Sequence, residues 1–165
     1  MLMRKRAWDM AREDYARVEG DASLVEVMRK LSECVKSGNG CLCVLVFEGT
    51  ELLGAVSIWD TIRFMNSTIR QIGLSREERE WDFENLFHAV CALGAAAHVT
   101  DVMDTGYTIL APDMPIPEIM AKLVKNGRSY AVVMEGTRTL GVIMIQDIFV
   151  ELTDEARSRE GAPKE

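Results

Sequence analysis

A phrase of thirteen residues occurs twice in this chain. Residues 48–60 read EGTELLGAVSIWD, and residues 135–147 read EGTRTLGVIMIQD. Each copy contains Glu-Gly-Thr, then Leu-Gly, and ends on an Asp six residues after the second glycine. Because self-similarity at a fixed spacing indicates duplicated structural units, the phrase predicts that the chain folds as two copies of one supersecondary unit.

The similarity extends upstream of the phrase. With an offset of 92 residues, Asp9 aligns with Asp101 and Tyr15 aligns with Tyr107. Within the phrase the offset is 87, so the first copy carries five extra residues, near VKSGNGC. The duplication therefore covers most of residues 7–66 and 98–152.

Each copy is predicted to fold in the order β-α-β-β-α. Apolar residues recur at helical spacing from Leu24 to Val35, and Ser23 with Glu26 forms a capping box. Apolar runs on both sides of each Glu-Gly-Thr predict a hairpin, to whose geometry we assign Gly54 and Gly141. The elements expected in the two copies are strands at 16–18 and 108–110, helices from 24 and 116, strands at 41–47 and 130–134, strands at 52–58 and 140–145, and helices from near Trp59 and Gln146.

Composition restricts the class of protein. The chain has 165 residues, of which 48% are apolar and 27% charged, which is typical of a globular protein. No run approaches the roughly 18 apolar residues of a membrane span, and no apolar stretch follows the basic start MLMRKR, which predicts a cytoplasmic protein without a membrane partner. The net charge of −7 disfavours nucleic acid as a partner.

The segment between the copies has its own pattern. Apolar residues spaced by three and four from Phe83 to Cys91 predict one amphipathic helix of about five turns that ends near Gly94, with Ser75 and Glu78 as its capping box. Its apolar face has two readings, a cover for the chain's own core or an interface with a protein partner. The expected organisation is a first repeat at 1–66, a linker helix at 67–98, a second repeat at 99–152 and a flexible tail at 153–165.

The last residue of the phrase is a candidate ligand-binding group. Asp60 is expected in the first turn of a helix that follows a strand, and the equivalent position of the second copy is Asp147. A carboxylate there can accept two hydrogen bonds from a vicinal diol such as ribose, with Ser57 within reach of the same ligand. The alternative for both aspartates is helix capping and compensation of the helix dipole.

The duplicated β-α-β-β-α order, with a glycine three residues before Ser57 and six before Asp60, resembles the cystathionine-β-synthase (CBS) domain. Two such domains in tandem resemble a Bateman module, an α/β fold in which the repeats pack with pseudo-two-fold symmetry. The family pattern G-x-x-[ST]-x-x-D is matched by Gly54, Ser57 and Asp60. In the second copy Gly141 and Asp147 match, and Met144 replaces the hydroxyl residue.

The resemblance also implies a ligand and its position. The family binds adenosine compounds in the cleft between the repeats and reads the adenine with backbone groups of its first two strands, which here include Tyr107, Thr108 and Tyr130. A phosphate requires positive charge nearby, and Arg63 and Arg128 are the candidates for it. The alternative for both arginines is a solvated surface charge.

Two functions remain open. The first is a regulatory module, commonly a homodimer, that binds AMP, ADP, ATP or S-adenosylmethionine and relays this by a conformational change. The second is a ligand-free dimeric scaffold for protein interaction. An enzyme is not expected, because the chain has no G-x-S-x-G motif and no Walker phosphate loop. No cofactor and no metal site are expected; His88 and Cys91, three apart, are more simply packed side chains than metal ligands.

Overall fold

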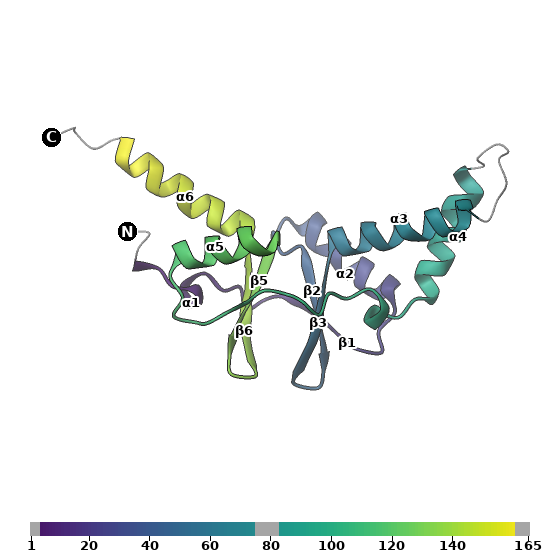
Figure 1. The fold of residues 1–165 in the computed structure, drawn as a ribbon, viewed down its shortest axis with the longest axis horizontal. Coiled ribbons are helices and arrows are strands. Elements are labelled where there is room, and N and C mark those ends of the chain that lie inside the picture. Colours follow the sequence, from purple (N-terminus) through teal and green to yellow (C-terminus); the bar gives the residue numbers. More distant parts are fainter. Residues whose placement is uncertain (1–3, 75–82, 161–165) are drawn as a thin grey trace. The chain divides into compact units, whose positions relative to one another are not determined.

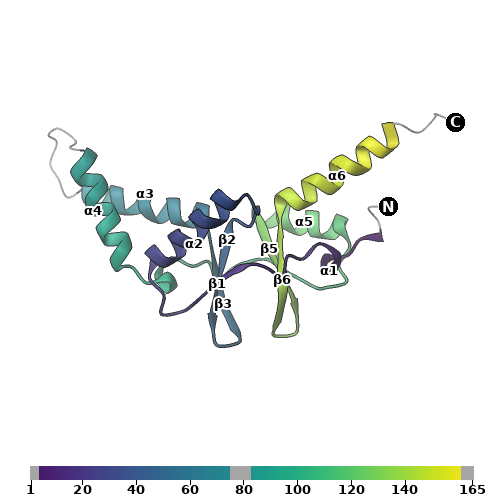
Figure 2. The same ribbon diagram turned by 180° about the vertical axis from the view of Figure 1, so that it is seen from behind.

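The computed structural model describes residues 4–74 and 83–160 (Figures 1 and 2). They form two compact units. The first repeat unit is residues 16–105, and the second repeat unit is residues 4–15 together with the described residues from Gly106 onward.

The first repeat unit contains one mixed sheet covered by helices. β1 runs parallel to β2, and β2 runs antiparallel to β3, in the order β1-β2-β3. Ser23 caps α2, because its hydroxyl accepts a hydrogen bond from the Glu26 amide at 3.3 Å, and Gly38 ends the helix in the left-handed conformation. The elements are β1 (Ala16–Glu19), α2 (Leu24–Ser37), β2 (Cys43–Glu48), β3 (Glu51–Ser57), α3 (Ile58–Leu74), α4 (Phe83–Ala96) and a 3₁₀ turn (Val99–Asp101).

The second repeat unit repeats this architecture. Its sheet has the order β4-β5-β6, again with one parallel and one antiparallel pair. Pro115 precedes the first turn of the helix that follows β4, and Gly127 ends that helix in the left-handed conformation. The elements are α1 (Ala7–Met10), β4 (Ile109–Leu110), α5 (Ile116–Asn126), β5 (Tyr130–Glu135), β6 (Arg138–Met144) and α6 (Ile145–Glu160).

Each unit buries its own apolar core. In the first, α2 places Leu24 and Val27 against Val44 and Val56 of the sheet. In the second, α5 places Ile119 against the sheet in the same way. The β-α-β-β-α order predicted from the sequence is confirmed in both units. Of the predicted periodic positions of α2, the fold buries Leu24, Val27 and Leu31, whereas Val35 at the end of the helix is 53% exposed.

The glycines of the repeated phrase have two separate roles. The hairpin turns use Gly49 and Gly136, each with a φ of 61°. Gly54 and Gly141 lie further along, next to a β-bulge in β3 and β6, where pairing skips one residue. The hairpin role expected for Gly54 and Gly141 is therefore wrong. Glycine is needed at both positions because the backbone of another segment passes close by. A Cβ atom on Gly54 would lie 2.9 Å from the carbonyl oxygen of Asp104.

That segment is the lead-in that precedes the first strand of a repeat. Residues 4–15 precede β1 of the first repeat but pack in the second repeat unit, where α1 lies beside β6 and buries Ala7 (Figures 1 and 2). Residues 98–105 precede the second repeat but pack in the first repeat unit, where Asp104 pairs with Ala55. Each repeat thus gives its lead-in segment to the other unit, which differs from the consecutive blocks expected from the sequence.

The linker differs from the single helix predicted. α3 continues from the first repeat through Leu74, so residues 67–74 belong to that helix. Ser75 and Glu78, the predicted capping box, lie outside the described residues. α4 ends at Ala96, close to the predicted end at Gly94, and packs against α2 and α3 of its own unit. Its Val90 is buried, whereas Leu93 is 49% exposed.

The tail expected from residue 153 begins as a helix. α6 extends through Glu160, so the first residues of the predicted flexible tail continue this helix, where Arg159 bonds Glu155 one turn earlier. No helix in residues 4–74 or 83–160 has the length and apolar character needed to cross a lipid bilayer.

Candidate functional site

The first copy of the phrase ends in a reciprocal capping box. The Asp60 amide donates to the Ser57 hydroxyl at 3.2 Å, and the carboxylate oxygen Oδ2 of Asp60 accepts from the Ser57 amide and from the Ser57 hydroxyl, both at 2.8 Å. These bonds fix the point where β3 becomes α3. The spacing of three between the hydroxyl residue and the aspartate is therefore required by the helix start itself.

The second carboxylate oxygen of Asp60 is in a different position. The guanidinium of Arg63 is 3.8 Å from Oδ1, which is beyond hydrogen-bond distance. Arg63 also lies over the ring of Trp59, at 5.8 Å from its centroid, and its side chain is 61% exposed. The side chain of Asp60 is 7% exposed. Within the described residues, Oδ1 thus faces an exposed cation and keeps its hydrogen-bond acceptor positions.

A buried thiol lies beneath this corner. Cys43 is directly opposite Ser57 in the sheet and is fully buried. Its pKa is raised well above the usual 9.0, first by a hydrogen bond with Cys41, then by burial and by the charges of Cys41, Cys34 and Asp60. A thiol held in its protonated form is a poor nucleophile, so Cys43 contributes packing and no covalent chemistry to this corner.

The second copy of the phrase forms the same corner with different partners. Oδ2 of Asp147 accepts from the Met144 amide at 3.0 Å, as Asp60 does from Ser57. Met144 has no hydroxyl, and its side chain is buried in the core. An arginine from the lead-in segment occupies the remaining positions: Arg12 donates from Nε to Oδ2 at 2.9 Å and from Nη2 to Oδ1 at 2.5 Å. Asp147 is therefore held in a two-pronged ion pair.

Arg12 has a structural counterpart in the first repeat unit. Its backbone pairs with Val142 through two hydrogen bonds, and the backbone of Asp104 pairs with Ala55 through two hydrogen bonds in the same way. The spacing of both pairs agrees with the offsets of the duplication. At one position of the repeat, the lead-in segment therefore carries a cation in the second unit and a carboxylate in the first.

The other predicted site residues lie in the second repeat unit. Thr108 is buried, its carbonyl accepts from the Val132 amide at 2.8 Å, and its hydroxyl accepts from the side chain of Asn126 at 2.9 Å. Tyr130 is buried and lies opposite Met144 in the sheet. Tyr107 and Arg128 are half-buried, and the Arg128 amide bonds the carbonyl of Leu123 at the end of α5. The structure thus brings Ser57, Asp60 and Arg63 together in one unit, and Tyr130 close to the Asp147 corner in the other.

Sequence analysis missed Arg12. The signal was present: aligning the lead-in segments at the offset of 92 places Arg12 on Asp104, a reversal of charge at one repeat position. What the sequence does not contain is the exchange of lead-in segments, which alone brings Arg12 to Asp147. The histidine and cysteine of α4 remain apart from this site, and the described part of the chain contains no group of three side chains suited to a metal ion.

Comparison with known proteins identifies the repeat. Residues 99–154 match the family model of the CBS domain. The second copy is a CBS domain. The first copy has the same order of elements, the same bulge and the same capping aspartate, so the chain has the fold of a tandem CBS pair. The resemblance noted in the sequence is confirmed.

Solved structures of CBS pairs match nearly the whole chain. A CBS-domain-containing protein from Agrobacterium tumefaciens shares 16% identity at a TM-score of 0.66, with 89% of this chain and 98% of that chain covered. The CBS domain pair of protein MJ0100, in complex with 5′-methylthioadenosine and S-adenosyl-L-methionine, shares 13% identity at a TM-score of 0.63, with 92% and 98% covered. The cytosolic domain of the Mg²⁺ channel MgtE, in complex with ATP, shares 15% identity at 0.60; 89% of this chain is covered, but it spans only 48% of that one.

These CBS structures establish the fold of the chain. Their sequence identities of 13–16% are too low to assign their ligands to it. Comparison with curated protein sequences found no match.

Proposed function

We propose that this chain is a regulatory CBS pair that binds an adenosine-containing ligand, ATP or S-adenosylmethionine, at the Ser57–Asp60 corner of its first repeat unit. The observation that carries the proposal is the asymmetry within the Asp60 carboxylate. Oδ2 is used by the capping box, whereas among residues 4–74 and 83–160 Oδ1 has only Arg63 nearby, at 3.8 Å.

The chemistry of this corner suits a ribose. An ionised carboxylate oxygen accepts two hydrogen bonds, and a vicinal diol donates two. Because the Asp60 side chain is 7% exposed, little water competes for Oδ1. Arg63 is exposed and held by one weak stacking contact, so its guanidinium can turn to a phosphate or a carboxylate of the same ligand. The corner itself is rigid, because the capping box fixes Asp60 before a ligand arrives.

The solved relatives support the ligand class. The MgtE domain was crystallised with ATP, and the MJ0100 pair with two adenosyl compounds. All three compounds carry the adenosine ribose, which is the group that Asp60 is suited to hold. In this proposal the protein performs no reaction; the ligand shifts the population of its conformations, and the shift is the signal.

The test compares matched variants in isothermal titration calorimetry with ATP and with S-adenosylmethionine. Asp60→Asn keeps an oxygen for the Ser57 amide and replaces the acceptor Oδ1 by an amide that cannot accept. Affinity for the ligand should fall at least tenfold, which corresponds to about 1.4 kcal/mol. Asp147→Asn changes the equivalent residue of the second repeat unit and should leave the affinity unchanged. Equal affinity in wild type and Asp60→Asn, or no binding of either ligand to the wild type, would refute the proposal.

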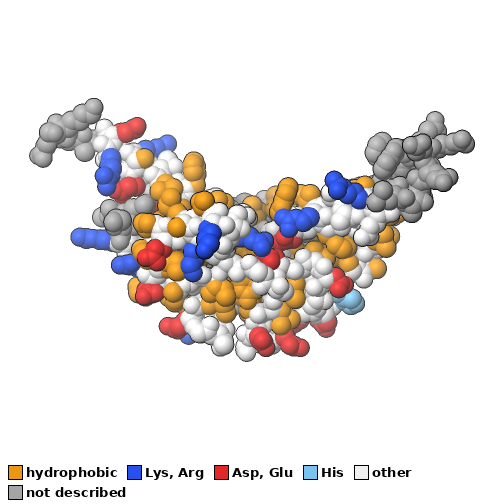
Figure 3. Space-filling view, in the orientation of Figure 1, with side chains coloured by type: hydrophobic (Ala, Val, Ile, Leu, Met, Phe, Trp, Pro, Cys, Tyr) orange, Lys and Arg blue, Asp and Glu red, His pale blue; other side chains and the backbone are white. Residues whose placement is uncertain are grey.

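A second candidate function, a ligand-free homodimeric scaffold, is favoured by exposed apolar positions that the duplication has kept. Ile62 on α3 is 53% exposed, and its equivalent Phe149 on α6 is 67% exposed. Figure 3 shows hydrophobic side chains at the surface among charged ones. Ile145 on α6 is also 49% exposed, whereas its equivalent Ile58 is half-buried and packs against the core of its unit. Apolar side chains retained at the surface of both copies are typical of a surface covered by another subunit.

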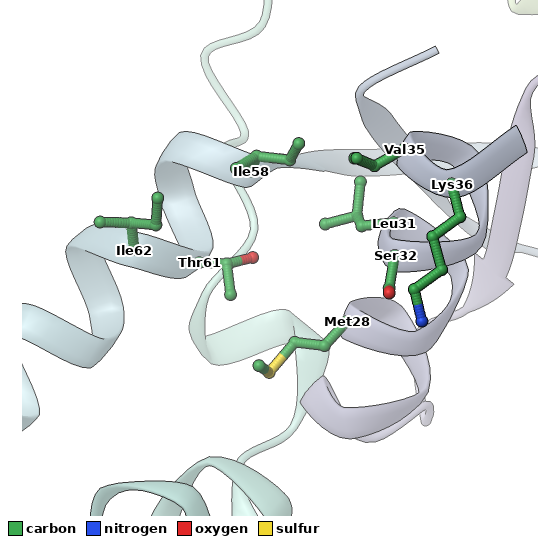
Figure 4. Close-up of a pocket in the computed structure, with 8 residues that line it drawn as sticks. All are labelled: Met28, Leu31, Ser32, Val35, Lys36, Ile58, Thr61 and Ile62. Carbon is green, nitrogen blue, oxygen red and sulfur yellow. The ribbon is translucent and has the colours of Figure 1, made fainter. Parts of the chain in front are cut away.

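The first repeat unit also has a groove beside Ile62. It has a volume of about 290 Å³ and lies between α2 and α3, whose side chains face each other across it (Figure 4). Its walls are almost entirely apolar. The residues that line it are Met28, Leu31, Ser32, Val35, Lys36, Ile58, Thr61 and Ile62.

Sedimentation velocity tests the scaffold function, which requires a dimer. In a scaffold, Ile62→Glu and Phe149→Glu convert a dimer into a monomer, because burying a carboxylate in an apolar interface is costly. Ile109→Glu changes an equally exposed apolar residue on β4 and serves as the control. A wild type that sediments as a monomer at high micromolar concentration would exclude the scaffold and leave the ligand proposal as it stands.

A further inference from the structure

We infer that Arg12 acts as an internal substitute for the ligand at Asp147, so that the chain binds one adenosine ligand at Asp60. The cavity of about 320 Å³ beside Asp147 remains, but Arg12 lines it and engages the carboxylate that a ribose would need. This inference rests on the proposed function of the Asp60 corner. It assigns to the lead-in segment the choice of which repeat binds.

The two aspartates differ in the number of hydrogen-bond acceptor positions that remain for a ligand. Asp147 accepts three hydrogen bonds, one from the Met144 amide and two from Arg12. A carboxylate offers about four acceptor positions, so at most one is left for a ligand. A vicinal diol needs two. Asp60 accepts two bonds, both on Oδ2, and retains those of Oδ1.

The guanidinium of Arg12 competes with a ligand for the carboxylate of Asp147. Arg12 meets Asp147 with two parallel donors, the same arrangement that a diol would have to make. Its side chain is 27% exposed and that of Asp147 is 18% exposed, so a competing ligand has to break a partly buried charge pair. A neutral diol is a weaker donor than a guanidinium and does not displace it.

The fold holds Arg12 beside Asp147. Its backbone is fixed to β6 by the two hydrogen bonds with Val142, at 2.8 and 3.0 Å, so the guanidinium remains near Asp147. The equivalent position of the first repeat unit is Asp104, a carboxylate, which cannot replace a ligand's donors at Asp60. The two copies therefore differ at the residue that decides whether a ribose can enter.

The test removes the Arg12 side chain beyond Cβ, including the guanidinium. Arg12→Ala keeps the backbone pair with Val142 and the cap from the Met144 amide to Asp147, so the fold of the corner is retained. Lys5→Ala is the matched control, because Lys5 lies in the same lead-in segment as Arg12 and pairs with Glu151 on α6, the helix that also carries Asp147. Calorimetry with ATP and with S-adenosylmethionine gives the number of sites per chain for each protein.

Wild type and Lys5→Ala should bind one ligand per chain, and Arg12→Ala should bind two. The added site should disappear again in Arg12→Ala/Asp147→Asn. Guanidinium chloride at low millimolar concentration should compete with the added site, whereas sodium chloride at the same concentration should not, because only guanidinium restores the missing group. A purely structural role of Arg12 would not produce this rescue.

Failure of the inference can be told from failure of the proposed function. If the wild type binds one ligand through Asp60 and Arg12→Ala still binds one, the corner is correct and the role of Arg12 is refuted. If the wild type binds none but Arg12→Ala binds one through Asp147, the assignment of Asp60 is refuted and the role of Arg12 stands. If neither protein binds either ligand, both are refuted.

Discussion

A Cβ atom on Gly141 would lie 2.5 Å from the carbonyl oxygen of Arg12. That carbonyl accepts a hydrogen bond from the Val142 amide at 3.0 Å, so the backbone of the lead-in segment is drawn close to β6 at this point. Gly54 has the same relationship to Asp104 in the other unit. The glycine of each Leu-Gly pair is thus explained by a segment from the other repeat, which must dock against it.

Gly141→Ala should therefore destabilise the protein by about 2–3 kcal/mol, because the atom it meets belongs to the backbone and cannot rotate away. The measurement is urea unfolding followed by circular dichroism. Gly136→Ala serves as the comparison: its φ of 61° is unfavourable for alanine, but nothing lies within 4 Å of the added atom, so about 1 kcal/mol is expected. A smaller loss for Gly141→Ala than for Gly136→Ala would contradict the close approach.

Removal of the lead-in segment should damage the second repeat unit and spare the first. A chain that begins at residue 16 loses Ala7, which is fully buried in the core of the second unit, and loses the Arg12–Asp147 pair. Hydrogen exchange followed by mass spectrometry should show loss of protection in β5 and β6 while β2 and β3 remain protected. Equal loss in both sheets would show that the two units unfold as one.

The two helix starts should respond in opposite ways to a hydroxyl group. Ser57→Ala removes one half of a capping box and should cost about 1 kcal/mol. Met144→Ser introduces the hydroxyl that the family pattern contains, but it also empties a position where the side chain is 1% exposed. Losing a buried methionine lowers the free energy of unfolding by about 2–4 kcal/mol, and a new cap raises it by about 1 kcal/mol. The variant should therefore be less stable than wild type in thermal unfolding.

Stability should fall in alkaline solution because of Cys43. Below pH 9.0 this thiol is protonated in both the folded and the unfolded chain, so it contributes no pH dependence. Above pH 9.0 the unfolded thiol ionises while the raised pKa keeps the folded one protonated, which favours unfolding by up to about 1.4 kcal/mol per pH unit. Urea unfolding from pH 8 to 10.5 should show a shallower decline for Cys43→Ala than for wild type. Parallel declines would mean that Cys43 ionises normally in the fold.

Local sequence signals predicted the elements well. The spacing of apolar residues from Leu24 onward predicted α2, and Ser23 with Glu26 predicted where it begins, because these features depend on neighbouring residues only. The corner at Asp60 was also foreseeable, since a hydroxyl and a carboxylate three residues apart specify a helix start.

Features that depend on distant residues were not foreseeable in this way. Whether Arg12 meets Asp147 is decided by where a segment 135 residues away docks, and no local pattern encodes that. The same holds for Gly141, whose neighbour is the backbone of Arg12. The extension of α3 to Leu74 was missed because its residues were grouped with the linker on the basis of apolar spacing further along.

The exchange of lead-in segments has a consequence for how such a chain could arise. Each compact unit is built from the body of one copy and the opening residues of the other. A chain with a single copy would therefore have an unpaired edge on its sheet and an N-terminal segment without a sheet to pack on. Two identical chains could fill both positions by exchanging their N-terminal segments. The duplicated chain contains the same exchange within one polypeptide, and its two lead-in segments differ, with Arg12 in one and Asp104 in the other.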